Sequence, residues 1–258
     1  MSEALNVTAA ERTMLILEQL SIHSSINLED LAKECNLPKA TLYRFLQTLI
    51  SLGYVRRDKN DKYSLTLRMF SVGSTSLEHT DLLNIARPIA EELSEHTGET
   101  VHIGMLEKTR AVYVLKIESA HTIRMFSRVG KRIPLHCTAI GKVFLSNLNT
   151  EKRTELFKKM HTEDGKFKKF TKNTLTTDEQ LNEELIKVSN LGYAHDNQEH
   201  EEGITCFAAP IRDTSGNVVA AISVSFPYFR FPKEKTEEIA TQIKKTATEI
   251  SVAAGFKN

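Results

Sequence analysis

Apolar residues at helical spacing divide the first part of the chain into three predicted helices. The first spans residues 8–23 with Thr8 as its expected N-cap, and the second spans residues 28–35 behind Asn27, a favoured capping residue. The third is expected from Lys39 to Leu52. Its apolar face comes from four residues spaced at i, i+3, i+4 and i+7: Leu42, Phe45, Leu46 and Leu49.

Two strand-like pieces, residues 54–57 and 63–67, follow the third helix and enclose a polar turn. Two short helices, a tight connection and a small β-hairpin make the pattern of a winged helix-turn-helix. We therefore predict such a domain over residues 6–67. Residues 68–97 have helical character with a break expected near Thr80 or Pro88, and we assign residues 68–81 to a linker helix.

The remainder, residues 82–258, forms a second predicted domain in which strands and helices mix. Strands are indicated by β-branched residues at 102–106, 112–117, 122–127, 204–211 and 218–226, the last two as a hairpin. Helices are expected at 138–148, within the charged segment 149–190 and at 233–255. The fold class is therefore α+β, with a winged helix-turn-helix, a linker helix and an α/β domain.

Composition alone does not identify a nucleic-acid partner. The 258 residues carry a net charge of +1, with 40% hydrophobic and 26% charged residues, which is typical of globular domains. Positive charge is instead local: residues 39–62 hold six basic and two acidic side chains, a net charge of +4. A protein that docks on phosphates needs such a concentration of charge.

The polar face of the third helix carries the side chains that DNA recognition uses. Arginine pairs with guanine edges and glutamine with adenine, while lysine, tyrosine and threonine suit phosphates. The candidate DNA-binding residues are Lys39, Ala40, Thr41, Tyr43, Arg44, Gln47 and Thr48 on the helix, with Arg57, Lys59 and Lys62 on the hairpin. The alternatives are a three-helix bundle with a solvated polar face and a winged helix that contacts only proteins.

Other classes of protein find little support. Three cysteines without a CxxC pair suggest reduced thiols in the cytoplasm, and no segment approaches the roughly 20 apolar residues of a membrane span. We expect no signal peptide, membrane partner, cofactor, metal or catalytic residue. The enzyme alternative would gather isolated histidines, cysteines and one carboxylate, but no HExxH or GxSxG motif supports it: His102, His136, Cys137, Asp196 and Cys206.

Several segments resemble one family of bacterial regulators. LPKATLYRFLQTL (37–49) and LGYV (52–55) resemble the winged helix of the isocitrate-lyase-regulator (IclR) family, whose pattern has serine where Ala40 stands. VGKRIPLHCTAIGKVFL (129–145), GITCFAAPI (203–211) and AAISVS (220–225) resemble its effector-binding domain. The resemblance spans nearly the whole chain and implies a GAF-like effector-binding domain after the DNA-binding domain.

The resemblance also implies where the effector binds: Ala139, Ile140, Asp196, Cys206, Ser223 and Ser225. Alternate strand residues share a face, so Ser223 and Ser225 point one way. A helix beginning near residue 138 would direct free backbone N–H groups at an anion. These features suit a small carboxylate, although each residue would also serve as an ordinary core residue or turn cap.

Three further segments resemble the branch of 2-keto-3-deoxygluconate regulators: IRMFSRVG (123–130), DNQEHEEG (196–203) and SFPYFRF (225–231). Arg124 and Arg128 are candidates to neutralise the effector carboxylate, or they face solvent. Phe226 is a candidate to narrow or reshape the pocket. We expect a repressor of a catabolic operon, controlled by a sugar acid such as 2-keto-3-deoxygluconate or by another small organic or aromatic acid. A homodimer or homotetramer would bind a palindromic double-stranded operator.

Overall fold

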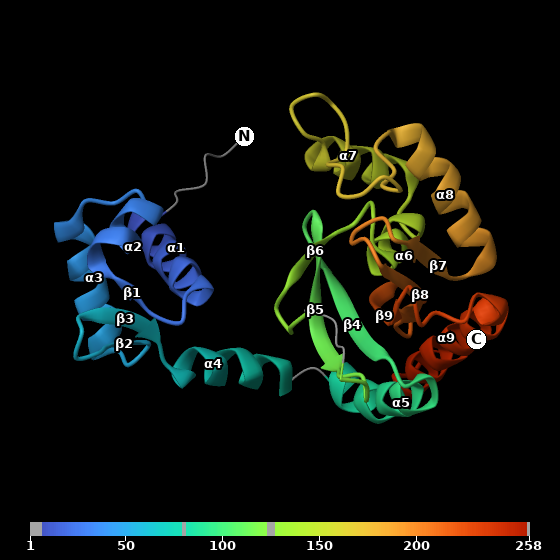
Figure 1. Ribbon diagram of the computed structural model, residues 1–258, viewed down its shortest axis with the longest axis horizontal. Helices are drawn as coiled ribbons and strands as arrows, with labels where there is room; N and C mark the ends of the chain where they lie inside the picture. The colour runs from blue at the N-terminus through green and yellow to red at the C-terminus, as the bar shows by residue number, and fades with distance from the viewer. Residues whose placement is uncertain (1–6, 79–80, 123–126, 257–258) are drawn as a thin grey trace. The chain divides into compact units, whose positions relative to one another are not determined.

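The computed structural model describes residues 7–78, 81–122 and 127–256, and it divides the chain into two compact units, Met1–Thr80 and Asp81–Asn258. Figure 1 shows the helices and strands of each unit. The division places the predicted linker helix almost entirely in the first unit, where it forms α4 (Leu67–Glu78). A second helix, α5 (Asp81–Thr97), opens the other unit.

The first unit contains the winged helix-turn-helix. Its elements are α1 (Thr8–Ile22), β1 (Ile26–Asn27), α2 (Leu28–Glu34), α3 (Lys39–Ser51), β2 (Val55–Arg57) and β3 (Lys62–Leu65), followed by α4. The three strands form an antiparallel sheet in the order β1-β3-β2. The sequence pattern missed β1, because a strand of two residues leaves no alternation to detect.

The core of this unit confirms most of the predicted helical stripe. Leu42, Leu46 and Leu49 of α3 are buried, whereas Phe45 is only partly buried at its edge. Asn27 caps α2 as expected, since its side-chain oxygen accepts a hydrogen bond from the Asp30 N–H at 2.9 Å. The expected cap at Thr8 is wrong: Thr8 is the first residue of α1, and the N-cap Val7 offers no side-chain acceptor.

The second unit is built on one six-stranded antiparallel sheet of order β6-β5-β4-β9-β8-β7. Its strands are β4 (Thr100–Glu107), β5 (Arg110–Ile117), β6 (Arg132–Pro134), β7 (Ala194–Asn197), β8 (Ile204–Arg212) and β9 (Val218–Pro227). Short β6 and β7 escaped the sequence analysis. The strand expected at 122–127 falls mostly on residues outside those described.

Helices cover both faces of this sheet (Figure 1). One face carries α5 and α9 (Thr236–Ala253), which follows the short 3-10 helix η1 (Lys233–Lys235). The other face carries α6 (Ala139–Ser146), with α7 (Thr150–Met160) and α8 (Asp178–Leu191) packed around it. This mixed architecture is the α+β class that the sequence predicts.

A close approach fixes α6 in place. Gly141 lies so near the chain at Leu135 that an added Cβ would stand 2.2 Å from the Leu135 carbonyl oxygen. Only glycine fits there. Because α6 is pinned between residue 135 and the sheet, its first turn opens toward strands β8 and β9.

Candidate DNA-binding surface and effector cavity

The exposed face of α3 carries the predicted DNA-binding side chains. Lys39, Ala40, Tyr43, Arg44, Gln47 and Thr48 are exposed and Thr41 is partly exposed, while the opposite face is buried in the core. The basic residues of the hairpin, Arg57, Lys59 and Lys62, are exposed as well. The structure therefore offers every one of these side chains, from helix and hairpin, to a partner.

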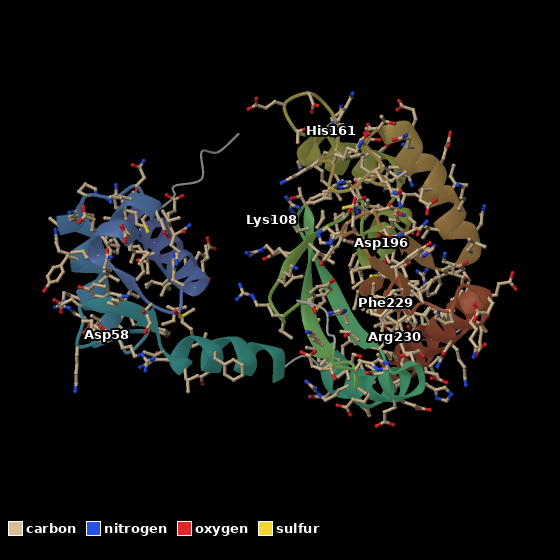
Figure 2. All side chains as sticks on the ribbon, in the orientation of Figure 1. Asp58, Lys108, His161, Asp196, Phe229 and Arg230 are labelled. Carbon is tan, nitrogen blue, oxygen red and sulfur yellow. The ribbon has the colours of Figure 1, made fainter. Side chains whose placement is uncertain are left out.

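The turn between β2 and β3, the wing, is rigid and partly charge-compensated. The Asp58 carboxylate accepts hydrogen bonds from the backbone N–H groups of Asn60 and Lys62 at 2.8 and 2.9 Å, and the bond from Lys62 is the main cause of its lowered pKa. Arg57 pairs with Asp61 at 2.8 Å. Figure 2 shows Asp58 at this turn. Lys59 and Lys62 have no ion pair of this kind among the described residues.

A shallow groove beside α3 adds one residue that the sequence analysis missed. Arg12 of α1 is exposed and lines it together with Thr41, Tyr43, Arg44, Phe45, Gln47 and Thr48. Nothing in the local sequence marks Arg12, because its place beside α3 depends on how the two helices pack. Arg12 and Arg44 together make this groove cationic.

The start of α3 explains what the alanine at position 40 removes. Pro38 is the N-cap and supplies no side-chain hydrogen bond. Ala40 is exposed in the first turn, where a serine hydroxyl would stand beside the free backbone N–H groups of the helix. With a methyl group at position 40, the backbone N–H groups are the polar groups that this turn offers to a partner.

The second unit contains a small cavity between α6 and the sheet. Its free volume is about 20 Å³, roughly the space of one water molecule. The residues around it are Tyr113, Ile133, Thr138, Ala139, Ile140, Asp196, His200, Glu201, Ile204, Cys206 and Ser223. Five of the eight residues predicted for the effector therefore lie together here: Ala139, Ile140, Asp196, Cys206 and Ser223. Figure 2 marks Asp196 within this unit.

The first turn of α6 supplies backbone donors to this cavity. Thr138 caps the helix: its hydroxyl accepts from the Gly141 N–H at 3.2 Å and donates to the Pro134 carbonyl at 2.6 Å. The Lys142 N–H bonds to the Thr138 carbonyl. The N–H groups of Ala139 and Ile140 therefore remain for a ligand, at the positive end of the helix dipole.

The strands supply the opposite wall. Cys206 pairs with Ser225 and Ala208 with Ser223 in the β8–β9 ladder, so these four side chains share one face of the sheet, as the alternation predicts. Ser225 is buried next to Cys206 but does not line the cavity. Burial, with the nearby Asp196 charge, raises the pKa of the Cys206 thiol. Cys206 is therefore a neutral packing group and not a thiolate.

Asp196 rests on a buried ion cluster that the sequence analysis missed. Its carboxylate accepts the Glu199 N–H at 2.7 Å, and Glu199 in turn binds the Lys142 ammonium at 2.6 Å. Lys142 is fully buried and also donates to Glu184 and to the His195 carbonyl at 3.3 and 2.9 Å. A lysine inside the apolar sequence of α6 was the available signal.

Burial decides the charge state of the polar groups around the cavity. Loss of solvation, with the neighbouring Glu199 charge, raises the pKa of Asp196 to about 7. Burial lowers the pKa of His200 to about 4, so His200 is neutral at physiological pH. Around pH 7 the cavity therefore presents hydroxyls, backbone N–H groups and the partly protonated carboxyl of Asp196, and the exposed Glu201 also lines it.

The two predicted arginines are not among the described residues that line the cavity. Arg128 is exposed and is not among the residues that line the cavity, and Arg124 lies outside the described residues. The expectation that Phe226 narrows the pocket is wrong. Phe226 follows Ser225 on β9, so it points to the opposite face of the sheet, where its ring packs 5.5 Å from that of Phe231.

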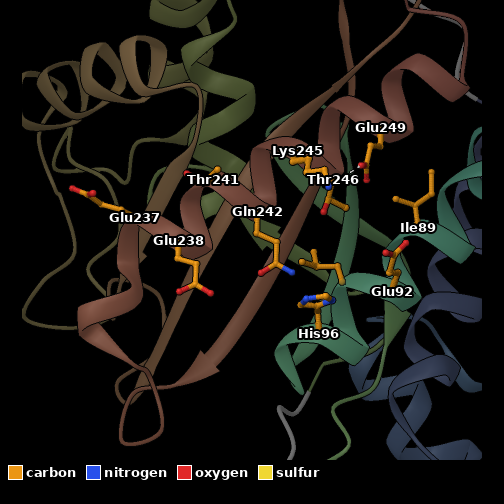
Figure 3. A pocket seen from close by; sticks show the side chains of 11 residues that line it. Ile89, Glu92, His96, Glu237, Glu238, Thr241, Gln242, Lys245, Thr246 and Glu249 are labelled. Atoms are coloured by element: carbon orange, nitrogen blue, oxygen red, sulfur yellow. Dashed lines mark ion pairs between the residues drawn. The ribbon is translucent and has the colours of Figure 1, made fainter.

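A second, open groove lies between α5 and α9 (Figure 3). Its walls include Glu92 and His96 of α5 and Gln242 of α9. None of the predicted effector residues lines it. Four carboxylates and one lysine, Lys245, line it, so its lining is more acidic than that of the cavity: Glu92, Glu237, Glu238 and Glu249.

The described residues offer neither a metal-binding cluster nor a membrane-spanning helix. No three His, Cys, Asp or Glu side chains there are arranged to hold a metal ion. No helix in that part of the chain has the length and apolarity needed to cross a membrane.

Comparison with known families decides what this architecture is. The IclR helix-turn-helix domain matches residues 9–59, and the bacterial transcriptional regulator IclR C-terminal domain matches residues 74–252. The chain belongs to the IclR family. The two matches fall on the winged helix and on the unit that holds the cavity.

Curated members of the IclR family align over almost the full chain. The regulator KdgR of Escherichia coli K12 is 38% identical over 252 residues, covering 97% of this chain and 94% of its own. The transcriptional repressor IclR of the same organism is 32% identical, covering 96% and 90%. The relatives are transcriptional regulators and not enzymes, so the chain is a DNA-binding transcriptional regulator, as the sequence predicts.

Solved structures of the IclR family agree. Thermotoga maritima IclR matches with a TM-score of 0.78 at 30% identity, covering 97% of this chain and all of that one. The C-terminal domain of E. coli KdgR matches with a TM-score of 0.61 at 36% identity, covering 68% and 99%. A Microbacterium hydrocarbonoxydans homologue complexed with 4-hydroxybenzoate shares the fold at 22% identity, with a TM-score of 0.82 over 95% and 98% of the two chains.

Proposed function

We propose that this IclR-family protein is a cytoplasmic repressor of a catabolic operon and that a small sugar acid, such as 2-keto-3-deoxygluconate, controls it. The observation that carries the proposal is the cavity at the start of α6, where backbone donors, hydroxyls and Asp196 meet. The 38% identity to KdgR and the likeness to 2-keto-3-deoxygluconate regulators support the effector class. The relative named a repressor supports the direction of control.

The DNA contacts follow from the exposed face of α3. Arg44 and Gln47 are the candidates to read base edges in the major groove, because both are exposed mid-helix and carry the pairing groups for guanine and adenine. Lys39, Thr41, Tyr43 and Thr48 would contact phosphates, and Ala40 would let the backbone approach. Arg57, Lys59 and Lys62 would contact the backbone from the wing.

The cavity suits a carboxylate held by hydrogen bonds. Within the described residues its lining contains no lysine or arginine, since Lys142 lies beneath it and is paired with Glu199. A carboxylate would therefore accept hydrogen bonds from the backbone N–H groups of Ala139 and Ile140 and from the hydroxyl of Ser223. Arg124 and Arg128 remain candidates for longer-range neutralisation from outside the cavity.

Dimer formation follows from unpartnered apolar residues on α4. Leu67, Phe70 and Val72 are 83%, 73% and 54% exposed, which is unusual for three large apolar side chains on one short helix. We infer that a second copy covers them, through the first unit, in a homodimer or a homotetramer. Two-fold symmetry then predicts a palindromic operator.

An aromatic acid is the second candidate for the effector. The Microbacterium homologue is crystallised with 4-hydroxybenzoate in the same fold. In this chain Tyr113 and His200 line the cavity and would provide stacking surfaces for a ring. Titration with both acids separates the two candidates.

The test measures operator binding and effector binding on the full-length protein. Arg44→Ala should weaken binding of the upstream operator about tenfold or more while leaving titration with 2-keto-3-deoxygluconate unchanged. Ser223→Ala should do the reverse, and Arg87→Ala on the exposed surface of α5 is the control for both. A wild-type protein that binds its operator but neither acid would overturn the proposed effector class and leave the regulator standing.

A further inference from the structure

One buried side chain beside the cavity has an unused hydrogen-bonding atom. His102 of β4 is fully buried, and its Nε2 lies 2.7 Å from the Ser127 hydroxyl. Within the described residues its Nδ1 has no partner. An unsatisfied buried nitrogen costs folding free energy, so a group of this kind in a binding domain calls for a ligand atom.

The sheet register places His102 on the cavity face. His102 pairs directly with Ser223 in the β4–β9 ladder, and Ser223 lines the cavity. Side chains opposite each other in an antiparallel pair lie on the same face, with Cβ atoms about 4.5–5.5 Å apart. Gly104, two residues along β4, lies on this face too, since a Cβ there would stand 3.0 Å from Ile140 Cγ2 of α6.

Tyr113 links the imidazole to the cavity wall. The His102 and Tyr113 rings stack with centroids 4.3 Å apart and an interplanar angle of 22°, and Tyr113 itself lines the cavity. The stack and the Ser127 hydrogen bond fix the orientation of the ring. Nδ1 is therefore held in place and does not turn to find another partner.

His102 does not itself line the cavity but lies behind the lining residues Tyr113 and Ser223, and its chemistry differs from that of the α6 terminus. Burial, with the nearby Lys116 and Lys131 charges, lowers the pKa of His102 to about 3, so the ring is neutral. A neutral ring with one free nitrogen either accepts or donates a single hydrogen bond, depending on its tautomer. A ligand hydroxyl can donate to or accept from this nitrogen and so fits either tautomer, whereas a carboxylate can only accept and fits one tautomer.

Resting on the proposed function, we propose that His102 is a specificity-determining residue whose Nδ1 hydrogen-bonds a hydroxyl of the effector. The carboxylate lies at the first turn of α6 and the hydroxyl-bearing carbons extend toward β4. The cavity then selects hydroxylated acids over acids of equal length without hydroxyls, because only the former satisfy the buried nitrogen.

The experiment compares two acids with the same carbon chain. Calorimetric titration of the full-length protein uses 2-keto-3-deoxygluconate and 2-oxohexanoate, which lacks the three hydroxyls. The wild type should bind the hydroxylated acid more tightly. His102→Gln places its amide near the position of Nε2 and keeps the hydrogen bond to Ser127 but not the one to the effector. His102→Asn places its amide near the position of Nδ1 and keeps the hydrogen bond to the effector.

His102→Gln should lose about tenfold or more in affinity for 2-keto-3-deoxygluconate and keep its affinity for 2-oxohexanoate, while His102→Asn should retain the preference. His195→Gln is the matched control, because His195 stacks on Phe207 and bonds Thr205, away from the cavity. Equal losses for both acids in His102→Gln, or an unchanged preference, would overturn this proposal alone. A wild type that binds neither acid would overturn the proposed effector class together with it.

Discussion

Asp196 makes effector binding sensitive to pH at the scale of one residue. It is buried, and burial with the neighbouring Glu199 charge raises its pKa to about 7. The titratable groups that surround it are Tyr113, Cys137, Lys142, Glu199, His200, Glu201 and Cys206. Below pH 7 the protonated carboxyl donates to an effector carboxylate, and above pH 7 the two negative charges repel. Affinity should therefore be greatest below pH 7 and fall by up to about tenfold per pH unit above it.

Calorimetric titration from pH 6 to 8.5 measures this effect. Asp196→Asn keeps a donor without a titrating proton and should flatten the profile. The same raised pKa also affects the stability of the fold. In the unfolded chain Asp196 ionises near pH 3.8, whereas in the folded protein it ionises near pH 7. The free energy of unfolding should therefore decrease between about pH 4 and pH 7 and stay constant above pH 7. A pH profile in the Asn variant as steep as that of the wild type would assign the titration to another group.

Position 40 offers a gain-of-function test. Ala40 is exposed in the first turn of α3, and its Pro38 cap provides no side-chain hydrogen bond. Ala40→Ser adds one hydroxyl next to the free backbone N–H groups, where a phosphate would dock. Operator affinity should rise about two- to tenfold, the effect of one added hydrogen bond, in a gel-shift titration at fixed salt. Ala9→Ser on α1 is the control and should change nothing.

At the scale of elements, α6 depends on one buried cation. Lys142 neutralises the buried Glu199 and also pairs at 3.3 Å with the partly exposed Glu184, which has a second partner in Lys187. Lys142→Met therefore leaves the Glu199 carboxylate buried without its ion-pair partner. Breaking a buried pair costs about 3–5 kcal/mol, which chemical denaturation would measure as a lower free energy of unfolding. Adding Glu199→Gln should recover part of the loss, since the amide carries no charge.

The control for this prediction is a surface lysine. Lys159 of α7 pairs with exposed Glu155, and Lys159→Met should leave the free energy of unfolding unchanged within error, because exposed pairs contribute little. If Lys142→Met unfolds at the same denaturant concentration as the wild type, the cluster does not hold the start of α6.

The limits of prediction from sequence also show at this scale. Long periodic stretches such as α3 and the β8–β9 hairpin were predicted because local pattern and tertiary packing agree. The register that joins Ser223 to Ala208 follows from a hairpin between neighbouring strands. His102 could not be placed beside Ser223, since that position depends on β4 pairing with β9, more than 100 residues away. Lys142 lies within one of the family motifs, but only packing reveals its ion pairs with Glu184 and Glu199.

At the scale of the whole molecule, binding of the operator and binding of the effector must be energetically coupled if the protein is a ligand-controlled repressor. The winged helix and the cavity belong to separate compact units. Any change in operator affinity caused by the effector must be matched by an equal change in effector affinity caused by the operator. We expect both ratios to lie between about 5 and 150.

Four titrations measure the two ratios: operator binding with and without saturating 2-keto-3-deoxygluconate, and effector binding with and without operator. Arg44→Ala should weaken operator binding about tenfold or more yet leave the effector affinity of the free protein intact. Ser223→Ala should leave operator binding at its ligand-free strength at effector concentrations that release the wild type. Because a ligand with equal affinity for both states shifts nothing, a ratio of one in both directions, despite tight binding, would show that the cavity does not control the winged helix.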